Sequence, residues 1–172
     1  MNADLDLDFN IVYEKYYPKI YNYAYYRLIN KEDAEDIVSE VFLKALNGIS
    51  RFDGKRADIS TWLFRIAANA VNDHFRRLKK AVFIPIEDAE PFLPDSDSNS
   101  MSDDMIHAED MQKLGECLKL LDDRTRGVLA LRYWGEFSYA GIAAQTGLSE
   151  KNVSVILIRG INRLKILFEK SF

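Results

Sequence analysis

The chain has 172 residues, of which 48% are hydrophobic and 29% are charged, and its formal net charge is −4. The single cysteine, Cys117, excludes a disulfide framework, and two histidines beside it give no metal-binding spacing, so we expect no metal and no cofactor. No apolar run approaches the roughly 18 uncharged residues of a membrane span, and the N-terminus is acidic where a signal peptide is basic. We therefore expect a cytoplasmic protein with no membrane span of its own.

The small net charge conceals an alternation along the chain. Residues 51–80 hold eight Lys or Arg against three Asp or Glu, and residues 126–172 hold seven against three. Residues 81–125, by contrast, hold three against twelve. Two basic segments separated by an acidic one predict two surfaces that can meet phosphates.

Two helices are predicted before residue 48. Apolar residues recur at helical spacing over residues 9–29, with Asp8 as the N-cap and with Pro18 expected to kink or split the helix. Asn30 is the expected N-cap of the second helix, whose opening turns are acidic, as the helix dipole favours. Its outward face has two interpretations, a solvated surface or a docking face for a partner.

A third helix is predicted after a loop over residues 48–58, with Ser60 as its N-cap. One side of this helix is apolar, and the other carries arginines and amides. Together with the basic loop, this composition suits single-stranded DNA, although Trp62 and Phe64 are more typical of a core than of a base platform.

The composition changes over residues 81–103, which are acidic and rich in serine and proline. Such a segment buries too little apolar surface to offset the entropy of ordering, so we expect a flexible linker. Beyond it, Met111, Leu114, Leu118 and Leu121 predict a helical face, and Asp122 and Asp123 are placed to cap the next helix.

The segment from residue 138 to residue 165 has the pattern of a helix-turn-helix. Ala143 is the small residue where two helices cross, Gly147 suits a reversal with positive φ, and Ser149 is a good N-cap for the second helix. An ordinary helical hairpin is the alternative interpretation of this stretch alone.

Three blocks of the sequence resemble the bacterial RNA polymerase sigma factors of the extracytoplasmic-function (ECF) type, in the sigma-70 family. They are DAEDIVSEVFLKAL (33–46), STWLFRIAANAVNDHFRR (60–77) and the stretch from RTRGVLALRYW to RGINRL (124–164), in the family's order and spacing. The resemblance implies an all-α fold of two small helical domains joined by a flexible acidic linker, the second containing the helix-turn-helix. It places a region 2-like domain at residues 1–80, the linker at 81–103 and a region 4-like domain at 104–172.

The same resemblance implies a protein that is not an enzyme but binds core RNA polymerase and directs promoter-specific transcription initiation. The implied partners are the clamp helices of the largest polymerase subunit, the flap of the second-largest subunit, promoter DNA and an anti-sigma factor. The polymerase-docking residues carried over from the family pattern are Asp33, Asp36, Ser39, Glu40 and Leu43.

The resemblance also assigns two DNA-binding sets. The loop and the third helix correspond to the part of the family that captures the melted minus-ten element. A flipped base needs a pocket, which the loop can provide, and its strand needs cations, which the loop and the helix both carry. This set comprises Phe52, Lys55, Arg56, Arg65, Asn69, Asn72, Arg76 and Arg77. The second helix of the helix-turn-helix corresponds to the reader of the minus-thirty-five element in the major groove. Its set comprises Lys151, Asn152, Ser154, Val155, Arg159 and Arg163.

The recognition helix departs from the family pattern. Relatives usually carry Lys or Arg at the positions of Ser154, Ile156 and Ile161, and residues 155–158 are all apolar, so apolar side chains surround this helix. Ser39 likewise replaces a common glutamine. We expect weaker DNA binding than in relatives, and an apolar face that packs on the N-terminal domain or on an inhibitor.

Two alternatives to a sigma factor stay open on the sequence. A helix-turn-helix regulator that acts without polymerase leaves the first module unexplained. A sigma-like adaptor that acts only through proteins is favoured by the apolar recognition helix. An enzyme has no support, because no nucleophile–base set or phosphate-binding glycine loop is visible.

Overall fold

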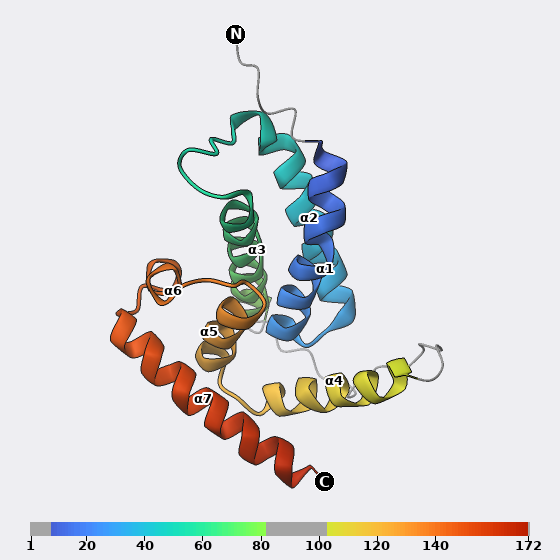
Figure 1. Cartoon of the computed structure of the whole chain (residues 1–172), viewed down its shortest axis with the longest axis vertical. Coiled ribbons are helices and arrows are strands. Elements are labelled where there is room, and N and C mark those ends of the chain that lie inside the picture. The colour runs from blue at the N-terminus through green and yellow to red at the C-terminus, as the bar shows by residue number, and fades with distance from the viewer. Residues whose placement is uncertain (1–7, 82–102, 172) are drawn as a thin grey trace.

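The computed structural model describes residues 8–81 and 103–171, which fold entirely into helices and connecting turns (Figure 1). The expected linker lies outside the described residues except at its two ends, which belong to helices. Within the described ranges there is no strand, and the elements in chain order are α1 (Phe9–Leu28), α2 (Lys31–Gly48), the 3₁₀ helix η1 (Ile49–Arg51), α3 (Ile59–Ala81), α4 (Asp103–Lys119), α5 (Asp123–Tyr133), α6 (Tyr139–Thr146) and α7 (Glu150–Lys170). The predicted all-α class is confirmed.

The first two helices begin where the sequence predicts. The Asp8 carboxylate accepts a hydrogen bond from the backbone N–H of Asn10 at 3.0 Å, and the Asn30 side chain accepts one from the N–H of Asp33 at 3.0 Å. The α1 helix does not split at Pro18. Proline has no N–H to donate to the carbonyl of Glu14, one turn earlier, but both residues are on the exposed side of the helix, where water can replace that donor.

The connection between α2 and α3 is shorter than predicted. The α2 helix extends to Gly48, and residues 49–51 form η1, so only residues 52–58 remain as a loop. Ser60 is not the N-cap of α3, because the helix begins at Ile59 and the carbonyl of Asp58 accepts the N–H of Trp62 at 3.0 Å. The Asp58 carbonyl thus makes the first bond of the ladder, and Ser60 lies in the first turn.

The C-terminal helices also start at their predicted caps. The Asp122 side chain accepts the N–H of Thr125 at 2.9 Å, and Ser149 accepts that of Asn152 at 3.2 Å. Gly147 ends α6 with φ 73°, which allows the reversal into α7. These contacts confirm the helix-turn-helix. Met111 is not part of the predicted core face of α4, because it is 46% exposed.

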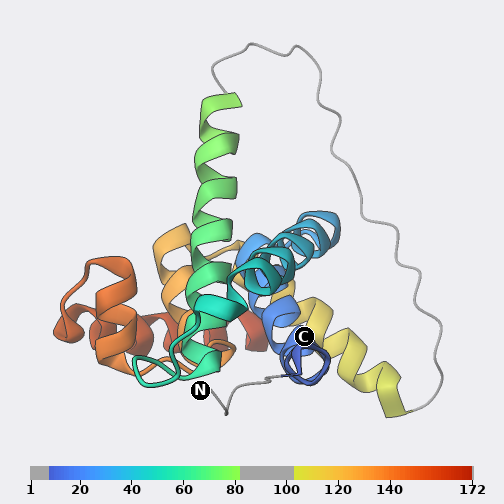
Figure 2. The same ribbon diagram turned by 90° about the horizontal axis from the view of Figure 1, so that it is seen from above.

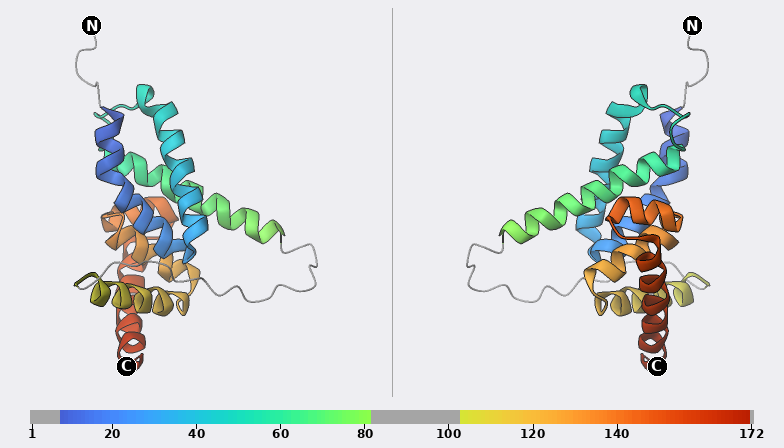
Figure 3. Two further views of the ribbon diagram at one scale, coloured as in Figure 1. Left: turned by 90° about the vertical axis from the view of Figure 1, so that its right-hand side faces the viewer. Right: turned by 90° about the vertical axis from the view of Figure 1, so that its left-hand side faces the viewer.

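The two groups of helices, α1–α3 and α4–α7, pack against each other and share one apolar core (Figures 1 and 3). The α1 and α5 helices form the main contact between them. Phe64 of α3 meets Phe137 edge to face, with ring centroids 6.0 Å apart, and Tyr26 of α1 stacks on Trp134 at 4.3 Å. The surface that meets the N-terminal helices is therefore mainly α5 and the turn after it, with Met111 of α4 against Tyr26, whereas α7 packs on α4, α5 and α6.

Candidate polymerase and promoter surfaces

The predicted docking residues on α2 divide into two groups. Asp36, Ser39 and Leu43 follow one line on the outward face of the helix and are exposed, Leu43 to 61%. The Ser39 hydroxyl bonds back to the carbonyl of Glu35 at 2.9 Å within the same helix. This line is therefore an acidic and apolar strip that is open to a partner.

The other two docking candidates lie at the edge of α2 that faces α3. Asp33 lies 3.5 Å from Nε2 of His74, and Glu40 pairs with Lys44 and lies 3.7 Å from Arg77. Because these carboxylates already have partners within the module, they are less available to another protein than Asp36.

Leu46 was missed by the sequence analysis. It lies one turn after Leu43 on the outward side of α2 and is 51% exposed. An apolar residue three positions beyond a docking leucine is the signal that could have identified it. With Leu46, the strip ends in two exposed leucines.

Four minus-ten candidates form a stripe on α3, which we name the α3 stripe: Arg65, Asn69, Asn72 and Arg76. Their spacing of four, three and four residues places them on one face of the helix, and all four are exposed. Arg76 lies 2.8 Å from Asp73 on the same helix. Arg77 is not in the stripe, because it lies towards Glu40 of α2.

The loop before α3 holds the remaining minus-ten candidates. The ring of Phe52 packs on that of Trp62, with centroids 5.1 Å apart. Asp53 accepts the N–H of Lys55 at 3.0 Å and pairs with the Arg56 side chain at 3.4 Å, which closes a tight turn. Lys55 and Arg56 are exposed, so the loop presents two cations beside a half-buried aromatic pair.

The front of α7 presents most of the minus-thirty-five candidates together. Asn152, Val155, Arg159 and Arg163 follow one side of the helix, and Lys151 lies beside them at its exposed N-terminal end. Ser154 does not join this set, because it lies on another side of the helix, and within the set Val155 is half-buried whereas the other members are exposed.

The apolar run on α7 is partly covered within its own group of helices. Leu157 is buried and Ile156 is half-buried against the core, but Ile158 is 59% exposed and Ile166 is 44% exposed. We expected the apolar face to pack on the N-terminal domain or an inhibitor, yet these two isoleucines remain open to solvent in this structure.

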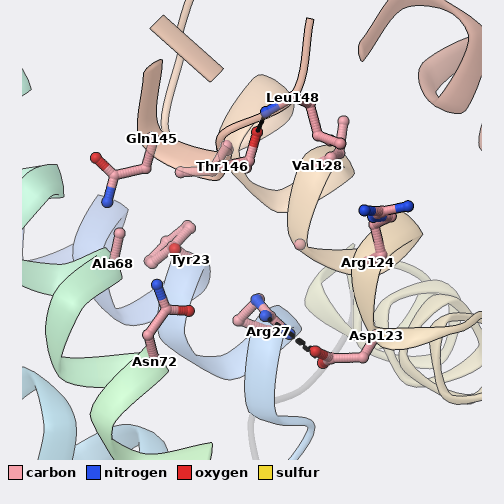
Figure 4. Close-up of a pocket in the computed structure, with 12 residues that line it drawn as sticks. Tyr23, Arg27, Ala68, Asn72, Asp123, Arg124, Val128, Gln145, Thr146 and Leu148 are labelled. Atoms are coloured by element: carbon pink, nitrogen blue, oxygen red, sulfur yellow. Dashed lines mark hydrogen bonds and ion pairs between the residues drawn. The ribbon is translucent and has the colours of Figure 1, made fainter. Parts of the chain in front are cut away.

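Two cavities lie where the two groups of helices meet. The larger, of about 440 Å³, is lined by Arg65 of the α3 stripe together with Glu136 and Gln145. The smaller, of about 210 Å³, is lined by Asn72 of the same stripe together with Gln145 and Thr146 (Figure 4). Two members of the α3 stripe therefore face α6 and the turn before it.

Arg27 and Asp123 close the floor of the smaller cavity with an ion pair at 2.5 Å (Figure 4). The arginine side chain is only 9% exposed, whereas that of the aspartate is 56% exposed. Burial by itself raises the pKa of Asp123, but the hydrogen bond and charge of Arg27, together with Arg126, lower that pKa below its ordinary value. Burial raises the pKa of the neighbouring Tyr23 to about 12, against a smaller lowering effect of Arg27.

Neither a membrane span nor a metal centre is visible in the part of the chain that the structure describes. No helix within residues 8–81 and 103–171 combines the length and hydrophobicity of a span. The same residues hold no group of three or more His, Cys, Asp or Glu side chains that could hold a metal ion.

Comparison with known families matches both groups of helices. The model of sigma-70 region 2 matches residues 12–81, and that of sigma-70 region 4 matches residues 117–165. The chain is 33% identical to the RNA polymerase sigma factor YlaC of Bacillus subtilis over 93% of this chain and 91% of that protein. It is 31% identical to the ECF RNA polymerase sigma factor SigW of Bacillus subtilis over 87% of this chain and 83% of that protein.

The fold is also that of a solved sigma factor. The chain superposes on RpoE from Bartonella quintana, solved in complex with the anti-sigma factor NepR, with a TM-score of 0.70 and 22% identity, over 94% of this chain and 97% of that one. At this identity the likeness concerns the fold alone. The region 2 and region 4 matches and the full-length relatives together show that the chain belongs to the ECF sigma factors, which bind RNA polymerase and direct promoter-specific transcription initiation.

Proposed function

We propose that the outward strip of α2, centred on Asp36, Ser39 and Leu43, docks on the clamp helices of the largest polymerase subunit. The exposure of these three residues supports this assignment, as does the combination of one carboxylate with exposed leucines. Asp33 and Glu40 then act mainly at the edge of the strip, where they hold α2 against α3. In this proposal the flap of the second-largest subunit contacts the region 4-like domain.

The α3 stripe and the loop before α3 are proposed to capture the melted minus-ten element. The observation that carries this proposal is the alignment of Arg65, Asn69, Asn72 and Arg76 on one exposed face. Arginines neutralise the backbone of a single strand, and amides offer hydrogen bonds to base edges. Phe52 against Trp62 offers an aromatic surface near the exposed cations of the loop.

The front of α7 is proposed to read the minus-thirty-five element. Lys151 and Asn152 occupy the N-terminal end of the recognition helix, which is the end that enters the major groove in helix-turn-helix proteins. Arg159 and Arg163 lie farther along the same side, where they can contact phosphates. Val155 provides an apolar contact, for which a thymine methyl group is suitable.

Three further assignments follow from the family. We propose a region 2-like domain over residues 1–80 and a region 4-like domain over residues 104–172, acting in the cytoplasm without enzymatic activity. An anti-sigma factor is the proposed inhibitor, as in the solved complex of a structural neighbour. Co-purification of the chain from native cells tests for this partner.

Two substitutions test the division of labour between α2 and α7. Asp36→Arg reverses a charge in the centre of the docking strip, so it should weaken binding to core polymerase without affecting folding, because Asp36 is exposed. Lys151→Ala should leave polymerase binding unchanged but weaken promoter binding by the holoenzyme. Equal losses of polymerase affinity in both variants would contradict the proposed surfaces.

A further inference from the structure

The smaller cavity between the two groups of helices has the composition of a small-molecule site. It is lined by α1, α5, α6 and the middle of α3, whereas the last turns of α3 project away from the other helices (Figure 2). Apolar side chains such as Ala68 and Val128 form part of its wall, and a few polar side chains line the rest (Figure 4). An apolar wall with a small number of polar groups is typical of ligand pockets.

Tyr23 is a buried polar group of this cavity that lacks a partner. The residue is 2% exposed, its ring packs edge to face on Phe64, and its hydroxyl makes no hydrogen bond to another described residue. A phenol hydroxyl removed from bulk water normally finds a hydrogen-bond partner, because leaving it unpaired costs free energy. Since Tyr23 lines the cavity, this partner has to come from inside the cavity.

Two amides and a cation line the same space. The side chains of Asn72 on α3 and Gln145 on α6 make no hydrogen bond to another described residue (Figure 4). Arg124 of α5 lines the cavity from an exposed position and has no ion pair among the described residues, whereas Asp123 is occupied by Arg27. The cavity therefore offers hydrogen-bond donors and acceptors beside one guanidinium that no carboxylate neutralises.

These groups match the chemistry of an adenine nucleotide. The amide of an asparagine or glutamine presents a donor and an acceptor that fit N7 and the N6 amino group of adenine, and a guanidinium binds the oxygens of a phosphate. At about 210 Å³ the cavity is smaller than the roughly 300–1,000 Å³ of sites that enclose drug-sized ligands, so it suits a base better than a whole nucleotide. The phosphate of such a ligand would lie at the exposed rim, beside Arg124.

We propose that this cavity binds an adenine nucleotide, with the base held by Tyr23 and Gln145 and the phosphate held by Arg124. Such a ligand touches helices of both groups, so its binding stabilises the contact between them. The ion pair on the floor of the cavity stays intact. The site does not depend on the proposed surfaces for polymerase and DNA, although Asn72 also belongs to the α3 stripe and is therefore left unchanged in the test.

Isothermal titration calorimetry of the whole chain with adenosine monophosphate tests the site. We expect saturable binding of one nucleotide per chain. Adenosine and inorganic phosphate each carry only part of the recognised groups, so each should bind at least about tenfold more weakly. Equal affinity for inorganic phosphate would overturn the recognition of the base, and equal affinity for adenosine would overturn the role of Arg124. The absence of saturable binding would overturn the proposal as a whole.

Three substitutions in the cavity test where the nucleotide binds. Tyr23→Phe removes only the hydroxyl, Gln145→Ala removes an amide, and Arg124→Gln removes the charge. Each should weaken binding of adenosine monophosphate by about three- to tenfold. Arg124 is exposed, so Arg124→Gln should fold normally and keeps the test valid if another variant is destabilised. Thermal unfolding without nucleotide identifies the folded variants.

Each substitution has a matched control at an exposed position outside the cavity. Tyr139→Phe, Gln112→Ala and Arg51→Gln make the same kinds of change and should leave the affinity for adenosine monophosphate unaltered. If folded cavity variants bind the nucleotide as tightly as their controls do, the nucleotide binds elsewhere on the chain and the proposal is overturned.

Discussion

Tyr26 and Trp134, 108 positions apart in the sequence, stack with their ring centroids 4.3 Å apart and their planes inclined by 21°. The Tyr26 hydroxyl also contacts the sulfur of Met111 at 2.9 Å, so one buried tyrosine touches two elements of the C-terminal group. This stack and the ion pair of Arg27 lie on consecutive residues of α1, which concentrates the contact between the two groups at the end of one helix.

The stack predicts an energetic coupling between the two groups of helices. We expect Trp134→Ala and Tyr26→Ala each to destabilise the chain, with a coupling of about 0.5–1.5 kcal/mol in a double-mutant cycle. Chemical denaturation of the wild type, the two single variants and the double variant measures this coupling energy. The pair Tyr26→Ala and Tyr139→Ala is the control, because Tyr139 is exposed and lies against Arg132. A coupling near zero in the first cycle would mean that the rings do not support each other.

Gly160 should not tolerate alanine, although it lies inside α7. A Cβ there would lie 2.8 Å from Cγ2 of Thr125 and 3.2 Å from Cδ1 of Leu129. The side chain of Thr125 is β-branched and stiff, and Leu129 is buried in the core, so neither can move aside easily. Alanine gains about 1 kcal/mol of helix propensity but overpacking costs about 1–3 kcal/mol, so we expect a net loss of stability. Asn162→Ala, at an exposed position of the same helix, should be neutral or slightly stabilising. Thermal unfolding of both variants compares them, and a stabilised Gly160→Ala protein would contradict the close packing of α5 on α7.

High pH should destabilise the contact between the groups. Burial disfavours the phenolate and raises the pKa of Tyr23 in the folded chain from the ordinary 10.0 of a tyrosine to about 12. Folding therefore favours the protonated form, so this contribution is complete below pH 10 and is lost as the pH rises towards 12. For Tyr23 alone it amounts to roughly 2–3 kcal/mol. Tyr23→Phe should lose correspondingly less stability than the wild type over this interval in denaturant titrations. Parallel losses would mean that Tyr23 ionises without penalty.

The exposed apolar side chains of α7 should limit binding to duplex DNA. Ile158 lies near the recognition end of α7, whereas Ile166 lies two turns farther along a similar face. Ile158→Lys should strengthen duplex binding and steepen the dependence of log K on log salt by about 0.9 for one added phosphate contact. Ile166→Lys is the matched control and should change the slope less. Equal slopes in the two variants would show that the position on α7 is unimportant.

The sequence predicts those features that depend on neighbouring residues. Ser149 before α7 and Gly147 at the reversal act within one turn of the chain, and both behave as expected. The start of α3 was misplaced by two residues, because Ser60 was expected as the N-cap whereas the helix begins at Ile59. The outward face of α2 was predicted only in part, because Asp36 is exposed but Asp33 and Glu40, also expected there, lie at the edge that faces α3.

The packing between the two groups was not predictable from local patterns. Arg27 looks like an ordinary cation near the end of a helix, and its burial depends on Asp123 and on the ring of Phe75, both distant in the sequence. Gly160 lies inside α7, where helix propensity alone favours alanine, and only its contact with Thr125 shows that a larger side chain does not fit. The cavities that Arg65 and Asn72 line together with Gln145 of α6 likewise depend on residues more than 60 positions apart in the sequence.

Run-off transcription with purified core polymerase tests the central claim most directly. Templates selected by binding to the holoenzyme are transcribed with and without the chain, and with the Asp36→Arg variant as the matched control. We expect initiation from a defined start site only when the wild-type chain is present, and a much smaller yield with Asp36→Arg. Polymerase binding without initiation, or equal transcription in the absence of the chain, would contradict its role as a sigma factor that directs promoter-specific initiation.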